Sequence, residues 1–159
     1  MKVRGDFVTN SSSSSFILGF TSADNVENEL ENGFPEWSTK YFGTVVNDVC
    51  QTEQFDKEEV IKRIRDEMQY SAKWRVEERY RRRTGCSYFE AMDYTKTDKG
   101  QKEVESYIEE IVNDAISKMD GKSIFVEVSY SDNDGGYFSE LEHEIMPSVE
   151  STIIRFNHH

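Results

Sequence analysis

The chain has 159 residues, enough for one domain that builds its own hydrophobic core without metal or disulfide staples. Apolar residues make up 36% and charged residues 31%, while 13% aromatic residues and two prolines argue against a disordered chain. A net charge of -12 opposes nonspecific contact with nucleic acid or an anionic membrane, so a basic partner is expected.

The first elements follow a run of five serines, Ser11 to Ser15. Residues 16–20 form a short apolar run bounded by turn-type residues, which favours a buried strand. A short helix is expected over residues 22–30, because a glycine and a proline follow as stop signals. Residues 37–49 repeat apolar side chains at every fourth position and favour another helix, although the adjacent β-branched residues Val45 and Val46 favour a strand.

The clearest helix signal begins at Asp56. Asp56 and Glu59 have the spacing of a capping box, in which each residue satisfies a free N–H group of the other. A single apolar stripe then continues for about 27 residues, or roughly 40 Å at the rise of an α-helix. Gly85 follows as a stop signal, so this segment predicts a long helix.

Two further capping signals follow. Ser87 and Glu90 repeat the capping box and predict a short helix through about residue 94. Asp98 is predicted to cap a second long helix, whose apolar stripe lasts until Gly121 offers a stop.

The last third of the chain has the pattern of strands. In residues 124–131 apolar and polar side chains alternate, which is the period of a strand with one buried face. Residues 132–136 are rich in aspartate and glycine and predict a turn. A return strand or short helix follows around Leu141, and residues 151–157 predict a final strand with its even-numbered side chains on one face.

Together these elements predict an α+β domain. A small antiparallel sheet would combine the N-terminal strand with the C-terminal strands, packed on one face by two long helices and shorter ones. The expected organisation is a single domain over residues 1–159. Its parts are a signature segment (1–15), a strand with short helices (16–55), a helical region (56–121) and a β-rich acidic region (122–159).

Cysteine usage and the start of the chain predict a cytoplasmic protein. Cys50 and Cys86 have no metal-ligand or redox spacing, and serines stand where a secretory signal would be apolar. No apolar run approaches the roughly 20 residues that cross a bilayer, so no membrane partner is expected. Nothing local marks either thiol as an activated nucleophile, and no catalytic residue is assigned.

Residues 7–16 read Phe-Val-Thr-Asn, five serines and Phe. This run resembles the opening of uncharacterised proteins from gut-type bacteria, their phages and mobile elements, whose remaining sequences differ from one another. The resemblance implies an accessory protein inside a bacterial host cell and no particular reaction. From composition alone, the serines are expected in a flexible or edge-strand N-terminus. The apolar residues on both sides of the run, Phe7 and Val8 before it and residues 16–18 after it, instead predict that the serines are tethered to the fold at both ends. The alternative is a compact turn whose N–H groups and hydroxyls hold an anion.

Residues 73–83 concentrate positive charge in an otherwise acidic chain. Six basic residues stand against two acidic ones, with Trp74 and Tyr80 between them. This composition suits phosphate contacts and base stacking and supports the hypothesis of a nucleic-acid-binding module. The alternative is a solvated helix end whose arginines complement the helix dipole. The candidate phosphate-binding residues are Lys73, Arg75, Arg79, Arg81, Arg82 and Arg83.

Residues 123–154 contain seven carboxylates and no lysine or arginine. Such a field of negative charge suits a basic groove on a partner protein, and the alternative is a surface that serves solubility. The candidate partner-binding residues are Glu127, Asp132, Asp134, Glu140, Glu142 and Glu144.

The same segment and the chain end hold the candidate metal ligands. Carboxylates and imidazoles suit several divalent ions, but the spacing matches neither an EF-hand nor a His-Glu-x-x-His motif. The Glu-Leu-Glu-His stretch and the terminal His-His are similar to the endings of other proteins with the serine signature, which implies native histidines. The candidate ligands are Asp132, Asp134, Glu142, His143, His158 and His159.

These observations favour a noncatalytic accessory protein of a phage or mobile element. It would bind a basic host protein through its acidic surface and need no cofactor, and an inhibitor of a host nucleic-acid enzyme, of the anti-CRISPR type, is one specific form. One alternative is a metal-dependent hydrolase or nuclease that uses the C-terminal Asp, Glu and His residues. The other is the nucleic-acid-binding module described above.

Overall fold

The computed structural model describes residues 12–158. They form two compact units, one made of the residues up to Lys57 together with those from Met119 onward, and one made of Glu58–Lys118. Each unit buries apolar side chains of its own. The second unit lies within the helical region 56–121, while the expectation of a single domain stays a prediction.

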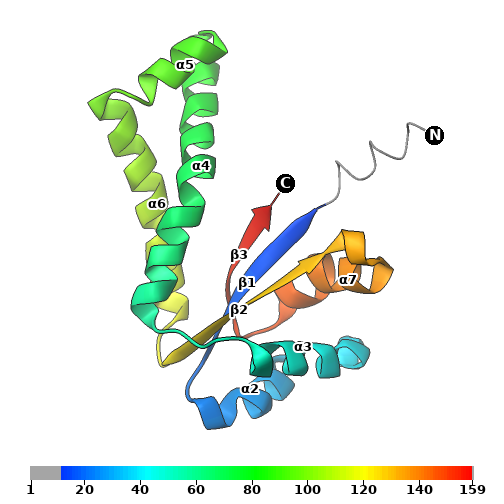
Figure 1. Cartoon of the computed structure of the whole chain (residues 1–159). Helices are drawn as coiled ribbons and strands as arrows, with labels where there is room; N and C mark the ends of the chain where they lie inside the picture. Colours follow the sequence, from blue (N-terminus) through cyan, green and yellow to red (C-terminus); the bar gives the residue numbers. More distant parts are fainter. Residues whose placement is uncertain (1–11, 159) are drawn as a thin grey trace, which may run out of the picture. The chain divides into compact units, whose positions relative to one another are not determined.

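The first unit is built on a three-stranded antiparallel sheet (Figure 1). Its strands are β1 (Ser13–Phe20), β2 (Ile124–Ser131) and β3 (Thr152–His158), in the order β2-β1-β3. The predicted α+β class and antiparallel sheet are therefore confirmed.

The serine run is part of the central strand. Ser13, Ser14 and Ser15 pair with β2 on one side and with β3 on the other. The expectation of a flexible or edge-strand terminus is wrong for these serines, because both neighbouring strands supply main-chain partners to them. Residues 7–11 of the signature lie outside the described residues.

One face of the sheet carries the core of the first unit. Phe16, Leu18 and Phe20 alternate along β1 toward this face and are fully buried. The core also draws on α2 (Val26–Gly33), α3 (Thr39–Gln51) and the segment that begins with α7 (Gly136–Glu140). The helices that contribute to this core are short ones.

The register of β3 departs from the predicted alternation. A register shift between β1 residues Ile17 and Leu18 interrupts the pairing with β3. As a result the buried residues of β3 are Ile153 and Phe156, which are three positions apart. The even-numbered face predicted for this strand is wrong, because a bulge breaks the period of two.

The connection from β2 to β3 is helical. A 3₁₀ turn, Asp132–Asp134, is followed by Gly135 with φ 108°, a conformation that favours glycine, and then by α7. Leu141–Ile145 form a π-helical turn in which the N–H of Met146 donates to the Leu141 carbonyl. Of the two predictions for this stretch, the short helix is confirmed.

The second unit consists of α4 (Lys57–Thr84, whose first residue belongs to the first unit), α5 (Tyr88–Tyr94) and α6 (Asp98–Lys118). Long helices α4 and α6 lie side by side, and α5 lies between them in the chain (Figure 1). Both hydrogen bonds of the predicted Ser87–Glu90 capping box are present. At the start of α6, Thr97 rather than Asp98 caps the helix, because its hydroxyl accepts from the Gly100 N–H at 3.1 Å.

Among residues 12–158, no helix combines the length and the apolar character that a bilayer crossing requires.

Candidate metal centre at the serine strand

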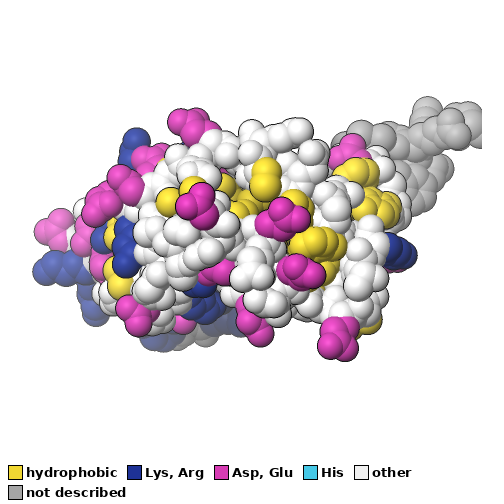
Figure 2. All heavy atoms as spheres, turned by 90° about the horizontal axis from the view of Figure 1, so that it is seen from below, with side chains coloured by type: hydrophobic (Ala, Val, Ile, Leu, Met, Phe, Trp, Pro, Cys, Tyr) yellow, Lys and Arg dark blue, Asp and Glu magenta, His cyan; other side chains and the backbone are white. Residues whose placement is uncertain are grey.

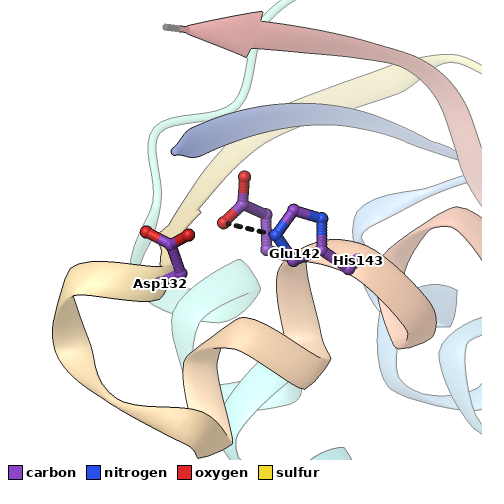
Figure 3. A group of neighbouring side chains, drawn as sticks. All are labelled: Asp132, Glu142 and His143. Carbon is purple, nitrogen blue, oxygen red and sulfur yellow. Dashed lines mark ion pairs between the residues drawn. The ribbon is translucent and has the colours of Figure 1, made fainter. Parts of the chain in front are cut away.

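The start of β1, the strand that contains the serine run, contacts two segments from the last third of the chain. Asp132 directly follows β2, and its N–H donates to the carbonyl of Ser12 at 3.2 Å. Glu142 and His143 lie in the π-helical turn after α7, and the Glu142 carboxylate points toward β1 (Figure 3). A π turn accommodates an extra residue in a helix and is frequent at functional sites.

Three side chains converge on the hydroxyl of Ser12. Its Oγ lies 3.0 Å from Asp132 Oδ2, 3.0 Å from Glu142 Oε1 and 3.3 Å from His143 Nε2. The backbone N–H of Ser12 donates a hydrogen bond to the other carboxylate oxygen of Asp132, Oδ1, at 2.9 Å. The Ser12 hydroxyl has a single proton, so it donates to only one of these three groups at a time. Asp132 also accepts from the Ser12 N–H, and Glu142 Oε2 lies 3.6 Å from His143 Nε2, with which it forms an ion pair when the imidazole is protonated.

Glu142 is fully buried, which is unusual for a carboxylate. Ser14 Oγ donates to Glu142 Oε1 at 2.9 Å, and Arg155 Nη2 lies 3.9 Å from the same oxygen. Arg155 in turn donates to Ser14 Oγ from Nε at 3.2 Å and from Nη2 at 3.1 Å. Two serine hydroxyls and one guanidinium thus offset part of the cost of burying this charge.

The arrangement is not that of a Ser-His-acid triad. In such a triad the acid binds the ring nitrogen that points away from the serine. Here the far nitrogen of His143, Nδ1, faces Arg155 Nη2 at 3.5 Å, while both carboxylates contact the Ser12 hydroxyl. No carboxylate therefore orients His143 as a base for Ser12.

The same three side chains have the composition of a metal site. Asp132, Glu142 and His143 each offer one ligand atom, and these atoms all lie within 4.8 Å of one another. A mixed set of oxygen and nitrogen ligands suits ions such as zinc and manganese. The His143 side chain is 45% exposed, so the centre has a side open to water.

Three of the six predicted metal ligands are therefore brought together. Asp134 is exposed and lines a separate hollow with Asp48 and Glu127. His158 contacts Ser15 Oγ at 3.0 Å, and Ser15 alternates with Ser14 to the other face of the sheet. His159 lies outside the described residues.

Ser12, Ser14 and Arg155 complete the cluster, and none of them was predicted from the sequence. The signal was present in part, because a period of two places Ser12 and Ser14 on one face if the serines form a strand. Arg155 is the first basic residue after the base-free segment. Its proximity to Glu142 follows from the pairing of β3 with β1, which a local pattern does not indicate.

Several residues of the predicted acidic surface are not free on the surface. Glu142 is buried and does not belong to an exposed surface, and Glu140 lies 3.6 Å from Lys40 in an ion pair. Glu127 and Asp132 are partly buried, which leaves Asp134 and Glu144 as exposed members without an ion pair among the described residues. On the face seen in Figure 2, acidic side chains are scattered among other side chains and do not form a continuous patch.

The predicted phosphate-binding residues all lie on α4 but do not act as one set. Four of them, Arg75, Arg79, Arg82 and Arg83, line two adjoining hollows. Arg81 lies 2.6 Å from Glu78 in an ion pair, and Lys73 lines a different hollow.

In comparisons with protein-family models, with curated proteins and with solved structures, nothing matches this chain. The function therefore has to be inferred from the geometry of the site.

Proposed function

We propose that this protein binds a divalent metal ion through Asp132, Glu142 and His143, with Ser12 at the same point, and that the ion serves hydrolytic chemistry. The observation that supports the proposal is the convergence of two carboxylates and an imidazole on one hydroxyl, each within 3.3 Å of Ser12 Oγ. A cation at this point would bring a positive charge closer to the two carboxylates than the single hydroxyl proton that they share.

The burial of Glu142 adds to this argument. Burying a carboxylate costs several kcal/mol unless it is well paired, so a fully buried one is a candidate functional group. Its nearest permanently charged partner, Arg155, lies 3.9 Å away, and His143, which is charged only when protonated, lies 3.6 Å away. Both distances exceed the length of a direct hydrogen bond. A metal ion would compensate this charge more closely than the guanidinium does.

Hydrolysis is the chemistry that such a centre supports. Three protein ligands would leave coordination positions for water, and a divalent ion held there would lower the pKa of that water toward neutrality. The partial exposure of Asp132 and His143 gives water and a substrate access to this side of the cluster. Nearby Arg155 suits an anionic group on the substrate.

Metal content and thermal stability test the proposal directly. The untagged protein is dialysed against manganese or zinc, and the bound metal is measured by elemental analysis. We expect one ion per chain and a rise in melting temperature of about 5 °C or more, because a ligand that binds the folded state at about 100 times its Kd stabilises it by about 2.7 kcal/mol. His143→Ala and Glu142→Gln should abolish both effects.

Matched control variants test whether the metal ion binds to exposed carboxylates in general. Asp134→Asn and Glu144→Gln each remove one exposed carboxylate within two residues of a proposed ligand in the sequence and should leave the metal content unchanged. A double variant, His158→Ala with His159→Ala, tests whether the chain end binds zinc instead. An unmodified protein without bound metal, or an equal loss in these controls, would overturn the proposal.

Hydrolytic activity is tested on the metal-loaded protein with bis(p-nitrophenyl) phosphate as the probe. Release of nitrophenol that His143→Ala abolishes supports the hydrolase. A stoichiometric ion without turnover would limit the function to metal binding. The earlier hypothesis of an acidic protein-binding factor stays a prediction, and the burial of Glu142 removes one of its six candidate residues.

A further inference from the structure

A basic groove runs between the facing sides of α4 and α6 in the second unit. It consists of two hollows of about 350 and 370 Å³ that share Arg79 and Tyr107 and therefore adjoin. We refer to it as the cationic groove. Its basic lining residues are Arg75, Arg79, Arg82 and Arg83 from α4, and Lys99 and Lys102 from α6.

Most of the positive charge of the groove is available to a ligand. The arginines and lysines of the groove are exposed, and within residues 12–158 neither Arg79, Lys99 nor Lys102 forms an ion pair. Three carboxylates also line the groove, and Glu78 is paired with Arg81 at 2.6 Å and with Arg82 of the groove at 3.8 Å. Glu103 accepts a hydrogen bond from Tyr94 at 2.6 Å. The groove is lined by six basic side chains and only three carboxylates, so its net charge is positive.

The groove stands out against the charge of the whole protein. Residues 58–118 carry 13 lysines and arginines against 14 acidic residues, whereas the rest of the chain carries 6 against 17. The second unit is therefore close to neutral, and its basic residues are concentrated along one groove. A strongly acidic chain repels polyanions in general, so a cationic groove on it indicates a selective anionic ligand.

Aromatic side chains border these charges. Trp74 lines the first hollow and is 50% exposed, so its ring is available to a ligand. Tyr107 lines both hollows, and Arg75 lies over its ring at 5.5 Å from the centroid. Basic side chains that follow a backbone, with an aromatic face for bases to stack on, are the two components of single-strand binding surfaces.

We propose that the cationic groove binds single-stranded nucleic acid, with phosphates at the arginines and lysines and a base stacked on Trp74. The groove is extended, since Arg75 to Arg83 span about 12 Å along α4 at the rise of an α-helix. A duplex keeps its bases stacked inside and offers none to Trp74. An acidic peptide would use the charges but has no aromatic base for the tryptophan. The proposal concerns the second unit and does not rest on the metal centre.

Fluorescence anisotropy with a labelled oligothymidylate of about 15 nucleotides tests the proposal, in EDTA so that the metal centre plays no part. With about four phosphate contacts, affinity should fall about 50-fold between roughly 50 and 200 mM salt. Arg79→Gln with Lys102→Gln should lower both the affinity and the salt dependence. Trp74→Ala should weaken binding by about 5- to 100-fold, and Trp74→Phe should retain most of it.

The control is Lys62→Gln with Lys118→Gln, which removes two exposed charges of the same unit outside the groove. It should bind as the unmodified protein does. Equal weakening by this control would show nonspecific attraction and overturn the proposal. So would tighter binding of a duplex of the same length, tighter binding of polyglutamate, or a Trp74→Ala variant with unchanged affinity. None of these outcomes would alter the metal content measured for the first unit.

Discussion

Replacing Arg155 with methionine should destabilise the first unit, because it removes the nearest full positive charge from a buried carboxylate. Arg155 Nη2 lies 3.9 Å from Glu142 Oε1, and the two side chains are 30% and 0% exposed. At an effective dielectric constant of about 20, two unit charges at this distance attract by about 4 kcal/mol. Partial exposure of the guanidinium reduces this figure, so Arg155→Met should cost about 2 to 3 kcal/mol.

The loss should depend on the charge of Glu142. In a Glu142→Gln background no carboxylate charge remains to be compensated, so the same Arg155→Met change should cost less than about 1 kcal/mol. A double-mutant cycle in EDTA measures this difference as the coupling energy between the two residues. Urea unfolding gives the free energies, and hydrogen exchange of β1 amides reports on the first unit separately, since a protein of two units need not unfold in one step.

Lys40→Met provides a matched control for the loss of one positive charge. Lys40 pairs with Glu140 at 3.6 Å, but both side chains are exposed, so this change should cost less than about 1 kcal/mol. If Arg155→Met cost no more than Lys40→Met, or if the two changes in the cycle were additive, the carboxylate of Glu142 would not depend on Arg155, and the reasoning would be refuted.

Two further predictions concern packing and alkaline stability. Gly100→Ala should destabilise the second unit by about 3 kcal/mol, because its Cβ would lie 2.1 Å from the Tyr94 carbonyl oxygen. Gly43→Ala in α3, where a Cβ meets nothing within 4 Å, should instead stabilise by about 0.5 to 1 kcal/mol, and equal effects in urea unfolding would contradict this. Burial, together with the hydrogen bond from its hydroxyl to Asp48 at 2.8 Å, raises the pKa of Tyr130 above the ordinary value of 10.0. Its contribution to stability is therefore complete below pH 10.0 and is lost at higher pH, as the unfolded chain gives up this proton first. Tyr130→Phe should make the unfolding free energy fall less between about pH 9 and about pH 11, and an unchanged fall would contradict the assignment.

Local patterns predicted most of the helices and strands correctly. The Ser87–Glu90 capping box, the helix that begins after Asp56 and the alternating strand over residues 124–131 depend on residues within one or two turns of each other. These elements form through contacts between side chains that are near each other in the sequence and therefore stay close in any conformation of the chain. The class of fold followed from the order of these elements.

The candidate site was predicted only in part. Asp132, Glu142 and His143 were chosen for their chemistry, but Asp134 and His158 had the same chemistry and lie elsewhere. Lys99 and Lys102 were missed because they join the arginines of α4 from a different helix. Residue type indicates which ligands a side chain suits, and it does not indicate which side chains share a position in space.

The serine run illustrates the same distinction. Its composition is typical of chain ends, and no local property of serine predicts a central strand. Its position depends on main-chain hydrogen bonds to strands more than 100 residues later, which also bring Asp132 and Arg155 to the serines. The amino-acid sequence alone thus establishes the local elements, the α+β class and the distribution of charge. The contact between Ser12, Glu142 and Arg155 is decided by the register of the sheet, because only long-range pairing places them together.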